Sequence, residues 1–446
     1  MVAKAVEGPS TITPVRPGSP ALSLVVPVAA PDVPDPGFLV RASDAAHRLG
    51  VTSEIVVAVP PSLAAAVQAQ WPGQPVLSAG DEGFGSVLAR GLQASRGEWV
   101  LTLDADLRDP AQVIAQLWSA RDGADIVIGS RLVPGGVSHV PGGRRLLSGA
   151  LNRIFSRGLS LSVQDMSSGH RLYRRSALPG TFHARGFDLL QEILVRAYAE
   201  GWRVREIPID YEPIHPGHAY RRLLNFGLDY LRTFWSLWKL RNSILAADYD
   251  DRAHDSAIPL QRYWQRQRFR HITELIGSEG PVLDVGCGSS RIIGALPRGS
   301  IGLDVLQRKL RYARKFGRAL VHGSGFNLPF PDGTFPVVLC SQVIEHVPKE
   351  SPILAELCRV LAPGGRLVLG TPDYARPEWV ITEKLYGFFA PGGYADEHIA
   401  HYTREELIAR FTAMGWTHEA TRYILRGELI LAFRKPAAGA SSPAAR

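Results

Sequence analysis

Two acidic residues at the end of an apolar run could bind a metal ion. In EWVLTLDADLRDP (98–110), Asp104 and Asp106 are separated by a single alanine. If a strand ends here, both carboxylates lie at its end and can share a hard divalent cation, Mg²⁺ or Mn²⁺. Such a cation could bridge the diphosphate of a nucleotide-sugar and neutralise the charge that grows on the leaving group. The pair therefore predicts a metal-dependent transfer site.

A glycine-rich segment later in the chain could hold a nucleoside-containing cofactor. Gly286 and Gly288, in VLDVGCGSS (282–290), directly follow an apolar run. Glycines in such a turn let the backbone approach a ligand closely. Asp304 follows Asp284 by 20 residues (304 − 284 = 20). At that spacing an acidic side chain can accept hydrogen bonds from a ribose diol.

Alternating strands and helices must position both groups. Apolar, β-branched runs alternate with segments of helical periodicity from Leu22 to Pro213, and a second such series starts near Pro281. This alternation predicts α/β domains built on parallel sheets. Because 446 residues are too many for one compact core, we expect an α/β protein of two domains. The predicted strands are LSLVVPV, EIVVAV, EWVLTLDAD and DIVIGS in the first series, and PVLDVGC, SIGLDV, FPVVLCSQV and GGRLVLGTP in the second.

The pattern also divides the rest of the chain. The predicted parts are a disordered leader (1–20), a first domain (21–216), a helical connector (217–276), a second domain (277–436) and a disordered tail (437–446). The connector could also be an N-terminal extension of the second domain.

Within the connector, RLLNFGLDYLRTFWSLWKL (222–240) contains Asp229, Arg232 and Lys239, so it is not expected to span a membrane. Two interpretations remain for this amphipathic segment. It could lie on an anionic membrane surface, or it could pack between the two domains.

Composition narrows the class of protein. With 45% hydrophobic and 21% charged residues, the chain is typical of a soluble globular protein. The net charge of +8 suits phosphate-bearing ligands. Its three cysteines form no CxxC pair, which excludes a disulfide framework and favours the cytoplasm, with peripheral contact at the inner face of the plasma membrane if 222–240 lies there. A nucleic-acid partner is not expected, because RYWQRQRFR stands outside any RNA-binding module.

The first series resembles the family 2 glycosyltransferases, most closely their dolichol- or polyprenyl-phosphate mannosyltransferase branch. The resemblance covers 22–215 and rests on four motifs in order: GFGSVLARGLQASRGEWVLTLDADLRDP, IVIGSRLVPGG, QDMSSGHRLYRRSAL and LLQEILVRAYAEGWRVREIPIDYEP. It implies a GT-A-like domain, a nucleotide-sugar donor, and a polyprenyl-phosphate or glycan acceptor.

The resemblance also implies roles for single residues. The implied metal ligands are Asp104 and Asp106, which would also contact the donor diphosphate, while Asp165 would lie near the acceptor and Glu192 would shape the acceptor side. These four form the predicted catalytic set. The implied donor-binding residues are Gly83, Gly85, Arg131, Arg144 and Arg145.

Some positions differ from the family pattern or allow another interpretation. Val28 follows Pro27 where the family has an aromatic residue, and Pro60 stands where an acidic pair is usual. The sequence therefore predicts no donor base, and the domain could be either a working altered site or a non-catalytic module that recruits substrate. Asp106 could instead be the N-cap of a helix. Glu192 could be a solvated residue on a helix, and Arg144 and Arg145 could belong to an ordinary charged surface.

The second series resembles the class I S-adenosylmethionine-dependent methyltransferases, of the methyltransferase type 11 kind. The motifs are VLDVGCGSS, IGLDV, NLPFPDGTFPVVLCSQVIEHV and RVLAPGGRLVLGTPD, and the resemblance covers 280–435. It implies a Rossmann-like domain and S-adenosylmethionine as cofactor. The implied cofactor-binding residues are Asp284, Gly286, Cys287, Gly288, Asp304, Ser324, Phe326, Asn327, Leu328 and Gln342.

Methyl transfer to a hydroxyl also needs a base, which the sequence does not identify. Glu345 and His346 could act there or could simply begin a helix, and YADEHIAHYT adds His398, His401 and Tyr402 as candidates for acceptor contact. Cys287 and Cys340 are expected to be small buried side chains.

Taken together, these features predict a bifunctional transferase whose two domains act in one pathway. Two alternatives stay open: a methyltransferase with a recruiting glycosyltransferase-like module, and a scaffold in which neither site turns over.

Overall fold

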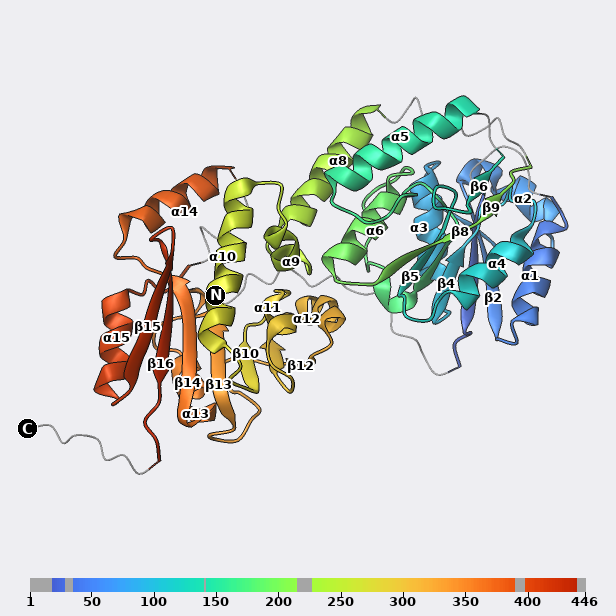
Figure 1. The fold of residues 1–446 in the computed structure, drawn as a ribbon. Helices are drawn as coiled ribbons and strands as arrows, with labels where there is room; N and C mark the ends of the chain where they lie inside the picture. Colours follow the sequence, from blue (N-terminus) through green and yellow to red (C-terminus); the bar gives the residue numbers. More distant parts are fainter. Residues whose placement is uncertain (1–17, 29–34, 140–141, 215–226, 390–397, 439–446) are drawn as a thin grey trace, which may run out of the picture. The chain divides into compact units, whose positions relative to one another are not determined.

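The computed structural model describes residues 18–28, 35–139, 142–214, 227–389 and 398–438. The chain forms two compact units that divide between Arg241 and Asn242 (Figure 1). Each unit contains one seven-stranded sheet, and a separate pair of short strands lies in the N-terminal unit. The predicted leader and tail fall largely outside the described residues.

The N-terminal sheet has the strand order β3-β2-β1-β4-β7-β5-β8. Strands β3, β2, β1 and β4 are parallel to one another, as the alternation predicted, whereas β7 runs antiparallel to both β4 and β5. The strands are β1 (Leu22–Pro27), β2 (Ser53–Val59), β3 (Val76–Ser78), β4 (Trp99–Thr102), β5 (Ile126–Ser130), β7 (Arg171–Arg174) and β8 (Val204–Pro208), and the short pair is β6 (Val137–Ser138) with β9 (Asp210–Tyr211).

Helices cover both faces of this sheet (Figure 1). Because side chains alternate along a strand, Leu24 of β1 joins a core with Phe38 and Leu117, while its neighbour Val25 joins a second core with Leu88. The helices are α1 (Phe38–Arg48), α2 (Ala64–Gln70), α3 (Phe84–Ala94), α4 (Pro110–Ser119), α5 (Gly142–Gly158), α6 (Leu189–Ala199) and α8 (Gly227–Asn242).

The C-terminal sheet has the order β12-β11-β10-β13-β14-β16-β15 and is parallel up to β14, with β16 antiparallel to both neighbours. Its strands are β10 (Val282–Val285), β11 (Ile301–Asp304), β12 (Ala319–His322), β13 (Phe335–Ser341), β14 (Leu361–Pro372), β15 (Thr417–Ile424) and β16 (Glu428–Arg434). Its helices are α9 (Tyr249–His254), α10 (Pro259–Ile276), α11 (Ile292–Ala295), α12 (Gln307–Ala313), α13 (Ile353–Val360), α14 (Pro377–Phe389) and α15 (Arg404–Ala413). The α/β class and the order of the two domains are confirmed.

The segment 217–276, predicted as a connector, is divided between the two units. On one side, Phe234 of α8 packs edge-on against Phe155, with ring centroids 4.9 Å apart. On the other side, Ile272 and Ile276 of α10 belong to the core of the C-terminal sheet. Residues 222–226 of the amphipathic segment lie outside the described residues. Among the helices that are described, none combines the length and the apolar character needed to cross a bilayer.

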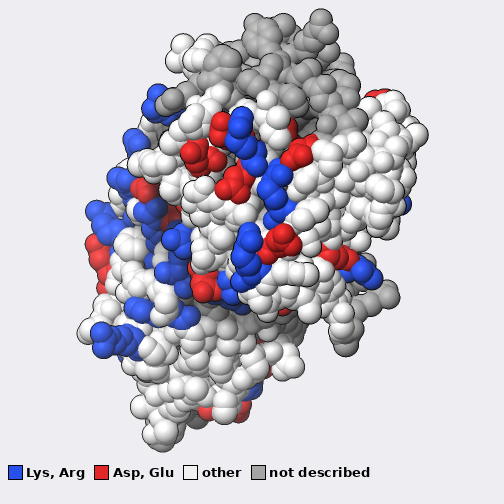
Figure 2. Space-filling view, turned by 90° about the vertical axis from the view of Figure 1, so that its right-hand side faces the viewer, with Lys and Arg blue, Asp and Glu red and all other residues white. Residues whose placement is uncertain are grey.

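Charged side chains are mixed on the surface that Figure 2 shows. Basic and acidic groups lie interspersed on that face, although the net charge is +8. Ion pairs such as Arg41 with Asp35, Arg96 with Glu54 and Arg108 with Glu212 belong to this mixed pattern across the N-terminal unit.

Candidate active sites

The Asp104 carboxylate stands just beyond the carboxyl end of β4. Its side chain is 31% exposed, so it can reach a ligand. Gly169 lies directly behind it, because a Cβ added there would come within 2.6 Å of Asp104 Oδ1. Nε2 of the buried His170 is 3.7 Å from Asp104 Oδ2. Two residues of the motif GHR therefore lie at this site. Gly169 leaves room for the Asp104 carboxylate, and His170 places beside it an imidazole that the sequence analysis had not identified.

His170 is unusual for a buried polar side chain. It is 1% exposed, and neither ring nitrogen has a hydrogen-bond partner among the described residues. Burial lowers the pKa of His170, although the charge of Asp104 opposes the shift. The ring is therefore neutral at neutral pH. Orphaned buried groups of this kind often mark a functional site.

Asp104 and Asp106 are candidate oxygen ligands for a hard divalent cation whose other ligands would come from the substrate. Within the described part of the chain, no third carboxylate, imidazole or thiolate completes a ligand group with them. Mg²⁺ is commonly held by one or two carboxylates, with substrate phosphates and water supplying the other oxygens. The N-cap alternative for Asp106 is wrong, because Asp109 is the N-cap of α4 and its side chain accepts a hydrogen bond from the Ala111 N–H.

Arg131 and Asp165 bind each other. Nε and Nη2 of Arg131 donate to the two oxygens of Asp165 at 2.8 Å each, and Nη2 also donates to Ser167 Oγ. Burial alone would raise the pKa of Asp165, but the charge and hydrogen bonds of Arg131 lower it to about 2. Both were predicted to face substrate, as phosphate contact and acceptor residue. In the structure they form a buried ion pair whose charges also act on His170.

Glu192 lies close to Gly83 and Gly85, the two glycines predicted to bind the donor. The interpretation of Glu192 as a solvated helix residue is wrong, because it is buried and accepts hydrogen bonds from the backbone N–H groups of His183 and Ala184. A Cβ at Gly83 would lie 2.4 Å from the Arg185 carbonyl oxygen. A Cβ at Gly85 would lie 2.6 Å from the Arg185 carbonyl carbon. Glu192 therefore holds the loop against which the start of α3 packs. The side chains of Arg144 and Arg145, in α5, lie outside what the structure describes.

The glycine loop after β10 is shaped by positive φ angles and close contacts. Gly286 has φ +75° and Gly288 has φ +54°. A Cβ at Gly286 would come within 2.2 Å of Val343. Asp304, at the end of β11, accepts hydrogen bonds from the Gly288 and Leu306 N–H groups at 2.8 and 2.7 Å. Each carboxylate oxygen keeps lone-pair capacity for a ribose hydroxyl.

Two further predicted cofactor residues, Asp284 and Cys287, are buried beside this loop. Burial, followed by the charge of Asp304, raises the pKa of Asp284 to about 8. The carboxyl group is therefore mostly protonated at neutral pH. Cys287 packs against Gly302, and Cys340 lies inside the core of the sheet.

Helix α9 closes over the glycine loop, a contact that the sequence analysis missed. Asp250 Oδ2 accepts hydrogen bonds from the N–H and the hydroxyl of Ser289 at 3.2 and 3.0 Å, and from Lys309 Nζ at 2.9 Å. Asp251 accepts hydrogen bonds from Tyr312 and Lys315 at 2.5 Å each. The segment YDDRAH, which was assigned to the connector, thus packs on the predicted cofactor loop.

The remaining predicted cofactor residues differ in exposure. Ser324, Phe326 and Asn327 are exposed on the loop after β12, whereas Leu328 is buried and its N–H donates to Glu356. Gln342 has φ +60°, an uncommon angle for a residue with a side chain. Its N–H donates to the Gly370 carbonyl at 2.8 Å.

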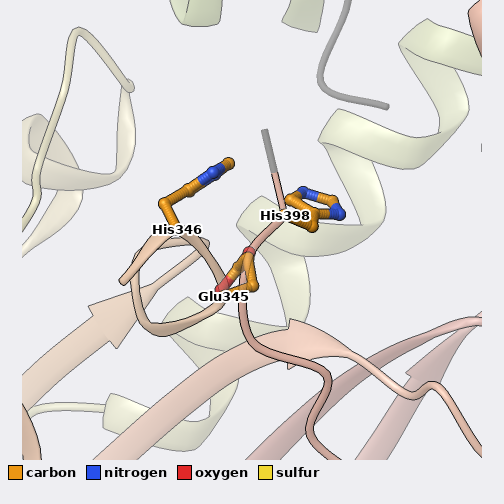
Figure 3. A group of neighbouring side chains, drawn as sticks. All are labelled: Glu345, His346 and His398. Atoms are coloured by element: carbon orange, nitrogen blue, oxygen red, sulfur yellow. The ribbon is translucent and has the colours of Figure 1, made fainter. Parts of the chain in front are cut away.

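Glu345, His346 and His398 converge beside the end of β13 (Figure 3). One ligand atom from each lies within 4.8 Å of the others. Glu345 is fully buried, and burial raises its pKa to about 8. Its Oε2 accepts a hydrogen bond from Thr371, while its Oε1 has no partner among the described residues.

The other two candidates for acceptor contact, His401 and Tyr402, lie outside this group. His401 is exposed and stacks on Tyr374, with ring centroids 4.0 Å apart. Tyr402 is 1% exposed and packs in the core of the sheet.

Comparison with known proteins identifies two domains. The family model for glycosyl transferase family 2 matches residues 63–182, and that for a methyltransferase domain matches residues 283–369.

Curated relatives follow the same division. The glycosyltransferase AglD of Haloferax volcanii is 32% identical over 35% of this chain and 26% of its own length. The dolichol-phosphate mannosyltransferase of Pyrococcus furiosus is 30% identical over 40% of this chain and 51% of its own length. The demethylmenaquinone methyltransferase of Shouchella clausii is 31% identical over 37% of this chain and 73% of its own length. The chain thus spans about a quarter and about half of the two glycosyltransferase relatives.

Proposed function

We propose a bifunctional transferase: the chain belongs to the S-adenosylmethionine-dependent methyltransferases through its C-terminal half and to glycosyltransferase family 2 through its N-terminal half. In this proposal the N-terminal unit transfers a sugar from a nucleotide-sugar, and the C-terminal unit methylates a product or substrate of the same pathway. The fusion of the two domains in one chain supports a shared pathway.

The observation that carries an active glycosyltransferase site is the group formed by Asp104, His170, Arg131 and Asp165. A buried ion pair is costly to assemble, and replacing it with apolar residues is often neutral or stabilising. A neutral buried imidazole with no partner among the described residues adds a further cost. Both features suit a site kept for chemistry. A module that only recruits substrate needs neither.

In the proposed reaction, an acceptor oxygen attacks the anomeric carbon of the donor sugar. Asp104 and Asp106 would hold Mg²⁺ or Mn²⁺, which when bound offsets the charge on the departing nucleoside diphosphate. The Arg131–Asp165 pair fixes the loop before β7. His170, uncharged, leaves the negative potential of Asp104 undiminished.

A polyprenyl-phosphate acceptor is supported by a pocket whose lining includes Leu132 and Gln164, the sequence neighbours of Arg131 and Asp165. The pocket has a volume of about 680 Å³, and its lining combines apolar Leu146 and Leu161 with basic Arg153 and Arg157. Apolar walls and guanidinium groups match a lipid chain that carries a phosphate. The P. furiosus relative, named for dolichol phosphate, points to the same class of acceptor.

For methyl transfer, the chain's own groups bind and orient. The glycine loop and Asp304 would hold the methionine and ribose parts of S-adenosylmethionine, which when bound presents an electrophilic methyl group. Val343 packs against Gly286 and sets the distance between the loop and the acceptor side.

We also place the protein in the cytoplasm, in contact with the membrane when segment 222–240 reaches it. Free cysteines at 287, 340 and 358 support a reducing compartment. Trp235, 56% exposed on α8, supplies an aromatic group of the kind that favours a membrane interface.

Calorimetric titration of the full chain tests the glycosyltransferase assignment. UDP, GDP, TDP and CDP are added in the presence of Mn²⁺, and the matched variant carries Asp104→Asn and Asp106→Asn. We expect one nucleotide to bind with metal dependence, and the variant to lose that binding while still binding S-adenosylmethionine. Failure of every nucleotide to bind, with S-adenosylmethionine binding intact, would instead favour the recruiting module, an alternative supported by Val28 and Pro60 at the altered strand ends.

A further inference from the structure

The geometry around Glu345 points to a second metal site: we propose that Glu345, His346 and His398 bind a divalent transition-metal ion in the methyltransferase unit. Among the described residues, this is the one group of three or more His, Cys, Asp or Glu side chains with the spacing of metal ligands. Figure 3 shows the three side chains converging from two separate segments of the chain.

Glu345 is the strongest part of this site. Its side chain has no exposed surface, and Oε1 has no hydrogen-bond partner within the described residues. A buried carboxyl group with an unpartnered oxygen is costly whether it is charged or protonated. The nearby guanidinium of Arg268 is already bound by both oxygens of Glu428, at 2.6 Å each. A cation between Glu345 and the imidazoles would give Oε1 a partner.

The two segments that carry the ligands are held together by the backbone. The N–H groups of Ile399 and Ala400 both donate to the carbonyl oxygen of Glu345, at 2.8 and 3.0 Å. These bonds fix the spacing between the turn that carries Glu345 and His346 and the segment that begins with His398. Because the distances between the ligands are fixed in this way, the protein needs little rearrangement when a metal ion binds.

His398 is also oriented by its neighbours. Its Nδ1 lies 2.9 Å from Glu383 Oε1 and 2.7 Å from the Tyr374 hydroxyl. A carboxylate that fixes the ring of a metal-bound histidine is a common second partner in metal sites. Glu383 therefore acts as a positioning residue in this proposal.

The ligand set selects the class of metal. Two imidazoles and one carboxylate suit Zn²⁺, Co²⁺ or Fe²⁺ better than Mg²⁺, which prefers oxygen ligands alone. Three protein ligands leave at least one coordination position open, as in catalytic zinc sites. This set also differs from the paired carboxylates Asp104 and Asp106 of the N-terminal unit.

The open position suggests the chemistry of the methyl acceptor, an inference that rests on the proposed methyl transfer. Val343, two residues before Glu345, packs against Gly286 of the cofactor loop, so the metal would lie on the acceptor side of that loop. A hydroxyl oxygen bound to the metal loses its proton more readily. In the step, the O–H bond breaks and its proton passes to water, an oxygen–methyl bond forms, and the sulfur–methyl bond of the cofactor breaks. The acceptor is thus an alcohol or phenol.

Titration of the full chain with Co²⁺, followed by visible absorption, tests the site without requiring turnover. The chain carries Asp104→Asn and Asp106→Asn, so that the N-terminal unit does not bind the probe. We expect one Co²⁺ per chain with the spectrum of a histidine-ligated ion, displaced by Zn²⁺. Glu345→Gln and His398→Ala should abolish the spectrum, and Glu383→Gln should weaken binding about ten- to a hundredfold.

His401→Ala is the matched control, because His401 lies three positions from His398 but is exposed and outside the group. It should bind Co²⁺ as the parent does. S-adenosylmethionine binding and circular dichroism show that each variant is folded. Unchanged Co²⁺ binding in folded Glu345→Gln and His398→Ala chains, or no binding by the parent, overturns the metal site. Metal binding without methylation of any hydroxyl acceptor would overturn only its assigned role in methyl transfer.

Discussion

Two buried carboxyl groups, one in each unit, have opposite electrostatic settings. In the N-terminal unit, Asp165 is paired with Arg131, and its pKa falls to about 2. In the C-terminal unit, Asp284 is also buried and has no basic partner among the described residues; burial, and after it the charge of Asp304, raises its pKa to about 8. The first carboxylate is charged and satisfied by the protein itself. The second is mostly uncharged at neutral pH, and in the proposed function a positive ligand would become its partner.

This difference matches the charges of the proposed ligands. A sugar diphosphate with its cation is best bound by side chains that are held rigidly and are already ionised before the ligand binds. S-adenosylmethionine carries a sulfonium and an ammonium group, both positive, and so can supply the charge that Asp284 lacks. The comparison can be tested by four measurements.

The largest effect is expected from removing the proposed metal ligands. Asp104→Asn with Asp106→Asn should lower glycosyl transfer by about a thousandfold, because charge on the leaving diphosphate is no longer offset. Methyl transfer, measured in the same preparation with radiolabelled S-adenosylmethionine, should be unchanged. A parallel fall in methyl transfer would show that the two sites are not independent.

The second test compares stability after removal of each buried charge. Asp165→Asn leaves Arg131 buried without its partner and should lower the free energy of unfolding by about 3 kcal/mol. Asp284→Asn replaces a protonated carboxyl with a neutral amide and should change it by about 1 kcal/mol or less. Urea unfolding followed by hydrogen exchange assigns each change to its unit. Equal losses in the two variants would contradict the comparison.

The third test is the pH dependence of stability. The lowered pKa of Asp165 gives stability that is present above its ordinary pKa of 3.8 and is lost as the pH falls towards 2. The raised pKa of Asp284 gives the reverse: stability present below 3.8 that is lost as the pH rises towards 8. Each single proton changes the free energy of unfolding by up to about 1.4 kcal/mol per pH unit within its window.

Scanning calorimetry between these limits should show the N-terminal unit weakening in acid and the C-terminal unit weakening towards pH 8. Asp284→Asn should remove the part of the alkaline loss that Asp284 causes, while the part caused by Glu345, whose pKa burial also raises to about 8, should remain. A C-terminal unit whose stability is flat from pH 4 to pH 8 would show that Asp284 is ionised throughout.

The smallest effect is expected in cofactor affinity. Binding of the positive cofactor should ionise Asp284 and release its proton, so affinity should rise up to about tenfold per pH unit below pH 8. Calorimetry in two buffers of different ionisation enthalpy measures the released proton. Asp284→Asn should abolish the release, and the retention of full proton release in this variant would assign it to another group.

Much of the fold could be predicted because burial leaves periodic patterns. Apolar runs such as LSLVVPV and PVLDVGC identified β1 and β10. The antiparallel direction of β7 could not be predicted in this way, since alternating burial is the same for either direction of a strand.

The site was less predictable where partners are distant in sequence. Arg131 and Asp165 are 34 residues apart (165 − 131 = 34), and family resemblance suggested a role for each without indicating that they pair. Asp250 was missed because YDDRAH has no apolar periodicity and contacts Ser289 and Lys309 far along the chain. His170 lies inside the motif QDMSSGHRLYRRSAL, and the glycine before it could have indicated that another group approaches the backbone closely at this point.

The position of α9 also determines which residue should begin a fragment that contains only the methyltransferase domain. The motifs of the methyltransferase begin near residue 280, and a fragment started there would seem to contain the whole domain. It would lack Asp250 and Asp251, which bind the cofactor loop and the helix beyond it. Gene dissection, domain swaps and searches for single-domain ancestors should therefore use the junction between Arg241 and Asn242.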